Sequence, residues 1–149
     1  MLNPRIPYRR SRFSTSLPEN RLYTAGHYSL EEVGGLWRIG FTRFATRMLG
    51  DVVDLEFTLA PGDRMETGQV VGHLEGFKAV TDILSPLAGS FEGANPVLDT
   101  DIDLINIDPY GRGWLYQVRG EAGEDCLDVH GYITALDATI EDLLETRNE

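Results

Sequence analysis

One lysine is the first candidate for chemistry in this chain. Of the thirteen basic residues only Lys78 has a side-chain primary amine, and the strand-like runs Gln69–Glu75 and Ala79–Leu84 flank it closely. This spacing predicts a β-hairpin with Lys78 at its tip. An amine held there is a reachable nucleophile in a fixed local shape, as an acylating enzyme requires. General replacement of lysine by arginine explains the scarcity of lysine but not this position.

Charged neighbours of Lys78 are the next candidates. Glu75 precedes the lysine by three residues and Asp82 follows it by four. Both either take part in recognition by a modifying or partner protein or occupy ordinary solvated strand positions, and the sequence leaves the two interpretations open. His73 is expected opposite or diagonal to Asp82, depending on which two residues form the turn. A His–Asp pair of this kind is structural more often than catalytic.

No other arrangement in the sequence predicts catalysis or metal binding. With one cysteine, Cys126, no disulfide can form within the chain, and no Cys-x-x-Cys or Cys/His metal spacing occurs. Three scattered histidines form no nucleophile–base motif. Cys126 is expected to be a small buried residue, with a redox thiol as the alternative. The sequence therefore predicts neither an enzyme nor a metal site.

The elements that must position Lys78 follow from short apolar runs between glycines and prolines. Besides the hairpin, strands are expected at Leu36–Phe41, Val52–Leu59, Ser90–Glu92 and Trp114–Arg119. Thr42–Leu49 is expected to form one or two helical turns, and the polar segment Asn95–Asp103 a loop.

The chain changes character from Gly131 onwards. Apolar residues then recur at helical spacing, namely Ile133, Leu136, Ile140, Leu143 and Leu144. This periodicity predicts an amphipathic C-terminal helix. Many short strands followed by a helix predict a mainly β protein, a small sandwich or barrel with helices packed at its edge.

The first twenty-one residues differ in charge from the rest. They contain five arginines and one glutamate, whereas the whole chain has a net charge of −11. Such a start can be a transit peptide, and Arg9–Arg10 is similar to a twin-arginine export signal, but no apolar segment follows it. We therefore expect residues 1–21 to form a basic arm, ordered or semi-ordered, and residues 22–149 to form one domain.

Charge and composition also restrict location and partners. An acidic surface repels nucleic acid and anionic membranes. No run approaches the roughly eighteen apolar residues of a membrane-spanning helix. A single cysteine is typical of a reducing compartment, so we expect a cytoplasmic protein without nucleic-acid or membrane partners.

Several motifs between His27 and about Glu145 occur together in the order of one family. They are Leu49–Leu55 (LGDVVDL), Pro61–Asp63 (PGD), Glu75–Gly89 (EGFKAVTDILSPLAG), Asn95–Pro96, Leu104–Leu115 (LINIDPYGRGWL) and the acidic C-terminal helix. In these motifs the chain resembles the H proteins of the glycine cleavage system, which are lipoyl carriers. The lysine motif and the DPYGRGWL stretch are specific in combination, and the resemblance excludes the basic arm.

The resemblance implies a fold, a cofactor and a role. The fold is a flattened β-sandwich of the biotinyl/lipoyl kind, a barrel-sandwich hybrid, with short helices and a C-terminal helix. By resemblance Lys78 corresponds to the lipoylated lysine, with flanking cofactor-site candidates at Glu75, Gly76, Phe77, Ala79 and Asp82. The implied role is a carrier, not an enzyme, whose covalent lipoate shuttles an intermediate between partner enzymes. A biotinyl carrier is the rival within this fold, but its lysine usually lies between methionines.

The lysine motif departs from the common family form Glu-Ser-Val-Lys-Ala. Gly76 replaces the serine and removes a hydroxyl, and Phe77 replaces the valine and places a large ring beside the lysine. His27 matches a family histidine but is followed by Tyr28 instead of the usual Glu-Trp. We therefore expect Lys78 to remain an attachment site whose contacts with a partner or with the attached arm differ from those of the family.

Three hypotheses about function remain open. In these departures the chain resembles a second branch of H-like proteins, the lipoate-binding proteins of bacterial sulfur oxidation. We therefore favour sulfur transfer with a heterodisulfide-reductase-like complex. The alternative is an aminomethyl carrier for the P, T and L proteins of glycine cleavage. Either carrier needs a lipoate ligase or a lipoyl transferase. The third hypothesis, from another class, is a non-lipoylated scaffold or binding module.

Overall fold

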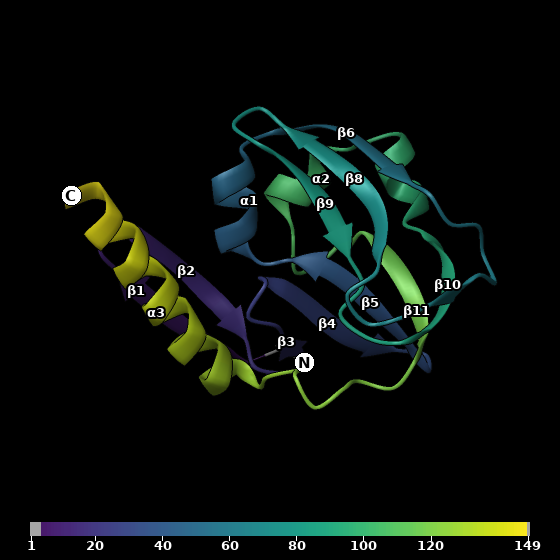
Figure 1. The fold of residues 1–149 in the computed structure, drawn as a ribbon, viewed down its shortest axis with the longest axis horizontal. Helices are drawn as coiled ribbons and strands as arrows, with labels where there is room; N and C mark the ends of the chain where they lie inside the picture. The colour runs from purple at the N-terminus through teal and green to yellow at the C-terminus, as the bar shows by residue number, and fades with distance from the viewer. Residues whose placement is uncertain (1–3, 149) are drawn as a thin grey trace.

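The computed structural model describes residues 4–148. In chain order the elements are β1 (Arg5–Arg10), β2 (Phe13–Pro18), β3 (Leu22–Tyr23), β4 (Tyr28–Val33), β5 (Leu36–Phe41), α1 (Arg43–Leu49), β6 (Val52–Phe57), β7 (Arg64–Met65), β8 (Val70–Gly76), β9 (Val80–Leu84), β10 (Gly89–Ala94), the 3₁₀ helix η1 (Pro96–Asp99), α2 (Leu104–Ile107), β11 (Tyr116–Gly120) and α3 (Val129–Asn148). Figure 1 shows their arrangement.

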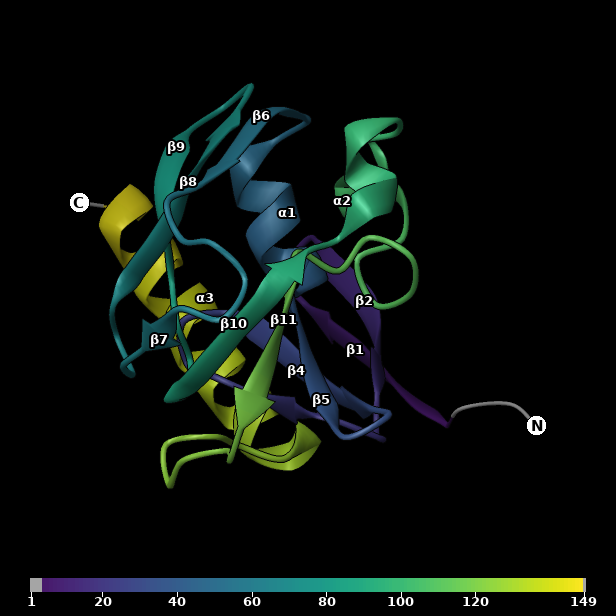
Figure 2. The ribbon, with the colours of Figure 1, turned by 90° about the vertical axis from the view of Figure 1, so that its right-hand side faces the viewer.

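Two sheets enclose the main core. The larger has the order β3-β4-β5-β11-β10-β7, and the smaller has the order β6-β8-β9. Figure 2 shows the smaller sheet above strands of the larger one. Buried side chains from both sheets form one cluster, including Leu30, Ile39, Phe91 and Val118 from the larger sheet and Val52, Leu74 and Ile83 from the smaller one. The predicted flattened β-sandwich is confirmed, and within residues 4–148 neither sheet closes into a barrel.

A second core joins the two ends of the chain. Strands β1 and β2 pair along their whole length as an antiparallel hairpin, which lies beside α3 away from the two sheets (Figure 1). Tyr8, Phe13 and Leu17 of the hairpin cluster with Leu136 and other residues of α3. The sequence predicts only an arm here, because alternating arginines and serines mask the inward-facing apolar positions.

Polar contacts also hold the hairpin against α3. The Tyr8 hydroxyl donates to Asp137 at 2.7 Å, and Arg10 pairs with Asp137 at 3.4 Å and with Glu141. Because the charged side chains of these ion pairs are partly exposed, the pairs add little free energy beside the apolar contacts. They fix the hairpin's position along the helix.

The helices follow the expected pattern, except that α2 was not expected and that η1 and the start of α3 differ from the expectation. The predicted turns after Thr42 form α1, whose N-cap is the Thr42 side chain, which accepts from the Ala45 N–H. The expected loop over Asn95–Asp103 is wrong in part, because Asn95 caps the 3₁₀ helix η1 by accepting from the Val97 N–H. Helix α3 begins at Val129, two residues before the expected start. Among residues 4–148, no helix has the length and apolar character needed to cross a membrane.

Candidate functional site

Lys78 lies at the tip of the β8–β9 hairpin, as the sequence predicts. The Gly76 N–H donates to the Ala79 carbonyl at 2.8 Å, so Phe77 and Lys78 are the two central turn residues. This turn places His73 directly opposite Asp82 in the register. Lys78 and Phe77 are exposed, and Phe77 keeps 84% of its surface accessible.

The tip is anchored to the junction between α1 and β6. The Phe77 N–H donates to the Asp51 carbonyl at 2.8 Å, and the Lys78 N–H donates to the Leu49 carbonyl at 2.9 Å. Turn amides would otherwise bond to water. The backbone that carries the lysine is therefore held by two tertiary hydrogen bonds that do not depend on side-chain identity.

Asn106, next to the tip, fixes the junction in turn. Its side-chain amide donates to the Gly50 carbonyl at 2.8 Å, and its side-chain oxygen accepts from the Val52 N–H at 3.0 Å. One half-buried side chain thus bridges the end of α1 to the start of β6. Asn106 is not predictable from the sequence, since nothing local to α2 indicates a contact with residues 50 and 52.

Two glycines allow the close approach of the tip to the junction. A Cβ atom on Gly76 would lie 2.2 Å from the Leu49 carbonyl oxygen, which excludes any larger residue without a backbone shift. Gly50 has a φ of 73° and packs against the Lys78 side chain. The sequence singles out Gly76 as a departure from the family motif, and the structure gives its reason. Gly50 was missed, although a glycine directly after a helix is a common C-terminal cap.

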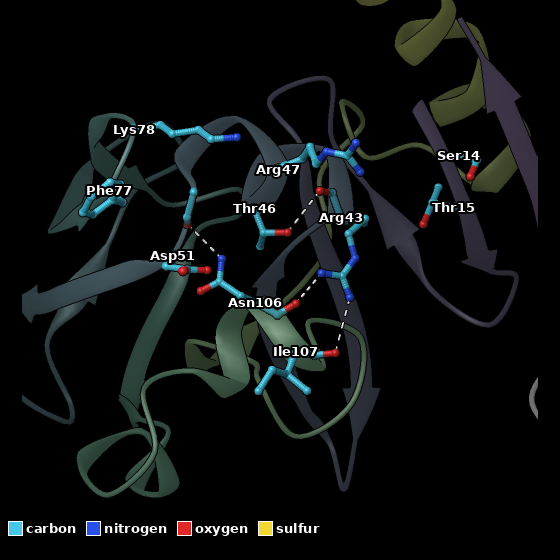
Figure 3. Close-up of a pocket in the computed structure, with 11 residues that line it drawn as sticks. Ser14, Thr15, Arg43, Thr46, Arg47, Asp51, Phe77, Lys78, Asn106 and Ile107 are labelled. Atoms are coloured by element: carbon cyan, nitrogen blue, oxygen red, sulfur yellow. Dashed lines mark hydrogen bonds between the residues drawn. The ribbon is translucent and has the colours of Figure 1, made fainter. Parts of the chain in front are cut away.

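An open cleft of about 640 Å³ begins at Lys78 and runs across α1. Its lining residues are Ser14, Thr15, Arg43, Thr46, Arg47, Gly50, Asp51, Phe77, Lys78, Asn106 and Ile107. Arg43 donates to the carbonyl groups of Asn106 and Ile107, which holds it along the wall. Figure 3 shows the Lys78 side chain extended over the cleft toward Arg47. One wall comes from β2, far from Lys78 in the sequence.

The acidic candidates lie on another face. Strand alternation after the β8 bulge buries Leu74 and turns His73 and Glu75 to solvent. There His73 Nδ1 lies 2.9 Å from Asp82 Oδ1, and Glu75 and Asp82 line a second hollow. Of the predicted flanking residues, Phe77 lines the same cleft as Lys78, and Ala79 is exposed directly after Lys78. Glu75 and Asp82 line the second hollow and not this cleft.

His27 and Cys126 are structural by their surroundings. His27 Nδ1 lies 2.8 Å from the Tyr132 hydroxyl, and its ring packs on Phe44 at a centroid distance of 4.7 Å. Burial lowers the pKa of His27 and favours its neutral form. Cys126 is half-buried against the main core, and burial raises the pKa of its thiol, which reduces its reactivity. The described residues contain no cluster of His, Cys, Asp and Glu that could hold a metal ion.

The fold and the site together define a two-sheet β-sandwich that presents one anchored lysine at a hairpin tip. The protein-family model for the glycine cleavage H-protein matches residues 21–138. The chain belongs to the glycine cleavage H-protein family. Members of this family are carriers with covalently attached lipoate, not catalysts, and they work with P, T and L proteins.

Individual relatives agree over most of their own length. The glycine cleavage system H protein of Corynebacterium jeikeium is 40% identical over 115 residues, covering 74% of this chain and 90% of the relative. That of Bacteroides thetaiotaomicron is 34% identical over 120 residues, covering 78% and 94%. A crystal structure of the H protein of Mycobacterium marinum matches with a TM-score of 0.70 at 32% identity, covering 78% of this chain and 95% of that one.

The family match leaves out both ends of the chain. It begins at residue 21, after the β1–β2 hairpin, and stops at residue 138, within α3. The wall that Ser14 and Thr15 give to the lysine cleft is therefore outside the region that defines the family.

Proposed function

We propose that Lys78 is the lipoylation site of this carrier. The observation that carries the proposal is the anchored tip, where the lysine backbone is bonded to Leu49 while the side chain extends freely over the cleft. Attachment joins the amine nitrogen to the carbonyl carbon of an activated lipoyl group, with loss of a proton from nitrogen and of the activating group. A lipoate ligase or lipoyl transferase supplies that activated group.

The bound lipoyl group would supply a dithiolane whose S–S bond breaks when one sulfur takes up the cargo and the other becomes a thiol. The chain's own residues fix the position of the attachment point. Because the two tertiary hydrogen bonds fix the tip, the attachment point keeps one orientation when a partner docks. Transfer from a docked partner then proceeds at the high effective concentration of a tethered reaction.

We further propose that the cargo is the aminomethyl group of glycine cleavage. The relatives described above are H proteins of that system, and they give no support to the sulfur-transfer hypothesis favoured from the sequence. The exposed face of β6, β8 and β9 is acidic, with Asp54, Glu56, Glu75 and Asp82 around one hollow. Carboxylates attract a protonated amine, whereas they repel an anionic sulfur species.

Intact-mass measurement tests the attachment site. Co-expression with a lipoate ligase is expected to add one lipoyl mass to the wild-type chain and none to Lys78→Arg, which keeps the charge but has no acylable amine. An unmodified wild-type chain would overturn the carrier proposal and leave the scaffold hypothesis. Modification at another residue would overturn the assignment to Lys78.

Reconstitution with P, T and L proteins tests the cargo. The lipoylated chain is expected to support glycine-dependent CO₂ release and to acquire the aminomethyl mass, and lipoylated Glu75→Gln and Asp82→Asn to do so less efficiently. Failure of the lipoylated wild-type chain in this assay, together with uptake of sulfur from a heterodisulfide-reductase-like complex, would overturn the glycine cleavage assignment.

A further inference from the structure

A hollow lined by arginines lies on the side of the larger sheet that faces away from the smaller sheet. Ile39 of β5 is buried in the main core, so its neighbour Arg38 projects from the opposite side of the sheet. There Arg38 lines an open hollow of about 400 Å³. Arg112 and Trp114, from the segment between α2 and β11, line the same hollow.

Two further arginines lie beside the hollow. The guanidinium carbons of Arg5 and Arg21 are each 5.6 Å from the centroid of the Tyr110 ring, which lines the hollow. Among the described residues of the lining, Glu31 is the only acid, and it pairs with Arg21 at 3.2 Å. Asp108 lies just outside, where its carboxylate accepts from a backbone N–H of the α2–β11 segment at 2.9 Å. Arginines therefore outnumber carboxylates here, although the net charge of the chain is −11.

The guanidinium groups of Arg38 and Arg112 have no partner within residues 4–148. Neither makes a hydrogen bond or an ion pair there, and Arg38 Nε is buried without an acceptor. Glu31 lies directly opposite Arg38 in the β4–β5 register, yet its carboxylate binds Arg21 instead. A buried donor without an acceptor is unfavourable, and so are like charges held close together. The fold thus leaves donors that an anion from outside the chain can satisfy.

Contacts with the surrounding fold hold the hollow in shape. The Arg38 guanidinium lies over the Trp114 ring, with Cζ 4.8 Å from the ring centroid. The buried Asn95 side-chain amide donates to the carbonyl groups of Arg112 and Trp114, at 2.8 Å each. One side chain therefore fixes the backbone of both residues. A ligand meets a site that is already formed, which reduces the entropy lost on binding.

We propose that this hollow binds a phosphate group, either as inorganic phosphate or as part of a small ester such as a nucleotide. The planar fork of a guanidinium matches two phosphate oxygens. Two such groups balance the charge of a phosphate ester, about −1.5 to −2 at pH 7. The volume is within the range of sites for small molecules. The hollow shares no lining residue with the lysine cleft, so the inference is independent of the proposed lipoylation.

Two-dimensional ¹H–¹⁵N NMR of the full-length chain tests the site, with sodium phosphate added at constant ionic strength. The signals of Arg38 Nε–H and of the Gly111 and Arg112 amides are expected to shift and to saturate with a Kd of about 1 mM or below. Adenosine monophosphate is titrated in the same way. Tighter binding than that of phosphate, with a shift of the Trp114 indole N–H, identifies a nucleotide as the source of the phosphate. Equal or weaker binding identifies the inorganic ion.

Charge-removing variants locate the binding. Arg38→Gln and Arg112→Gln are each expected to weaken phosphate binding by about tenfold or more, because each removes a charged donor. Arg38→Lys keeps the charge without the fork and is expected to fall between Arg38→Gln and the wild type. Because Arg112 is exposed, a dispersed spectrum of Arg112→Gln separates loss of binding from loss of folding.

Arg12→Gln is the matched control. Arg12 is exposed and has no ion pair among the described residues, as is true of Arg112, but it lies in the β1–β2 turn outside the hollow. This variant changes the net charge by the same amount. Its Kd for phosphate is expected to equal that of the wild type.

Three outcomes overturn the inference. Shifts that are absent, that do not saturate, or that persist in Arg38→Gln and Arg112→Gln show an adventitious ion only. Saturable shifts confined to the Phe77 and Lys78 amides place phosphate in the lysine cleft instead. A response of the hollow's signals to poly-glutamate but not to phosphate assigns the arginines to an acidic protein partner. The proposed function of Lys78 is unaffected in each case.

Discussion

The side chain of Lys78 packs directly over Gly50. A Cβ atom on Gly50 would lie 2.9 Å from Lys78 Cγ and 3.1 Å from the Lys78 backbone nitrogen. The lysine at the end of one hairpin therefore depends on the absence of a side chain at the end of α1. This contact ties the orientation of the amine to the helix cap.

Gly50→Ala is expected to slow lipoylation several-fold and to lower the free energy of unfolding by about 1–2 kcal/mol. The methyl group pushes the lysine away, and a φ of 73° strains any residue with a Cβ atom. Gly68→Ala is the matched control, because Gly68 has a φ of 84° and open space around it. Equal lipoylation rates for the two variants would show that the Gly50 contact does not position the amine.

Restoring the family serine at position 76 is expected to damage this chain. In Gly76→Ser the Cβ atom meets the Leu49 carbonyl oxygen at 2.2 Å, so the hairpin tip must move away from the junction. We expect a loss of about 2–3 kcal/mol in urea unfolding. Gly123→Ser controls for composition, since nothing lies within 4 Å of a Cβ atom there. Wild-type stability of Gly76→Ser would contradict the close approach.

Asn106→Ala is expected to loosen the junction beneath the tip. It leaves the Gly50 carbonyl and the Val52 N–H without their partner, at a cost of about 1–3 kcal/mol. Hydrogen exchange of the Phe77 and Lys78 amides is the direct readout, and both are expected to exchange faster. Asn106→Asp keeps only the acceptor for Val52 and is expected to fall between the wild type and the alanine variant. Unchanged exchange in Asn106→Ala would separate the tip from the junction.

His27 is expected to make stability depend on pH. Burial lowers the folded-state pKa below the unfolded value of about 6.5, so as pH falls the unfolded chain takes up a proton first. Its contribution is therefore complete above about pH 6.5 and is lost below it, by at most ~1.4 kcal/mol per pH unit until the folded pKa is reached.

The measurement is urea unfolding of the wild type and His27→Asn between pH 5 and about 7.5. Asparagine suits this comparison because it tolerates the positive φ of position 27, 72°. The variant is expected to lose less stability than the wild type as pH falls. Parallel curves would show that His27 does not titrate differently in the two states.

Local sequence patterns are sufficient to predict many of the strands, the C-terminal helix and the position of Lys78. Residues 36–41 form β5 with the expected bounds, and short flanking strands placed Lys78 at a hairpin tip before any tertiary information. The C-terminal helix followed from its apolar period. These features are local, so a single sequence is enough to predict them.

The features that could not be predicted from the sequence depend on contacts between distant segments of the chain. Arg10 lies 131 residues from its partner Glu141, so nothing near Arg10 indicates that its charge faces a helix. Asn106 bonds to residues more than fifty positions away, and Gly76 is explained only by the carbonyl of Leu49. The division of the chain at residue 21 stays a prediction, since the hairpin before it shares a core with α3.

Because the backbone anchors the tip, the position of the lysine at residue 78 does not depend on the side chain at residue 77. Since the amide groups hold the turn, residue 77 can change its side chain without moving the lysine. A phenylalanine that is 84% exposed there is thus open to variation for partner choice, while the geometry of attachment is inherited unchanged. Related carriers can in this way change their partner proteins while the attachment lysine keeps its position.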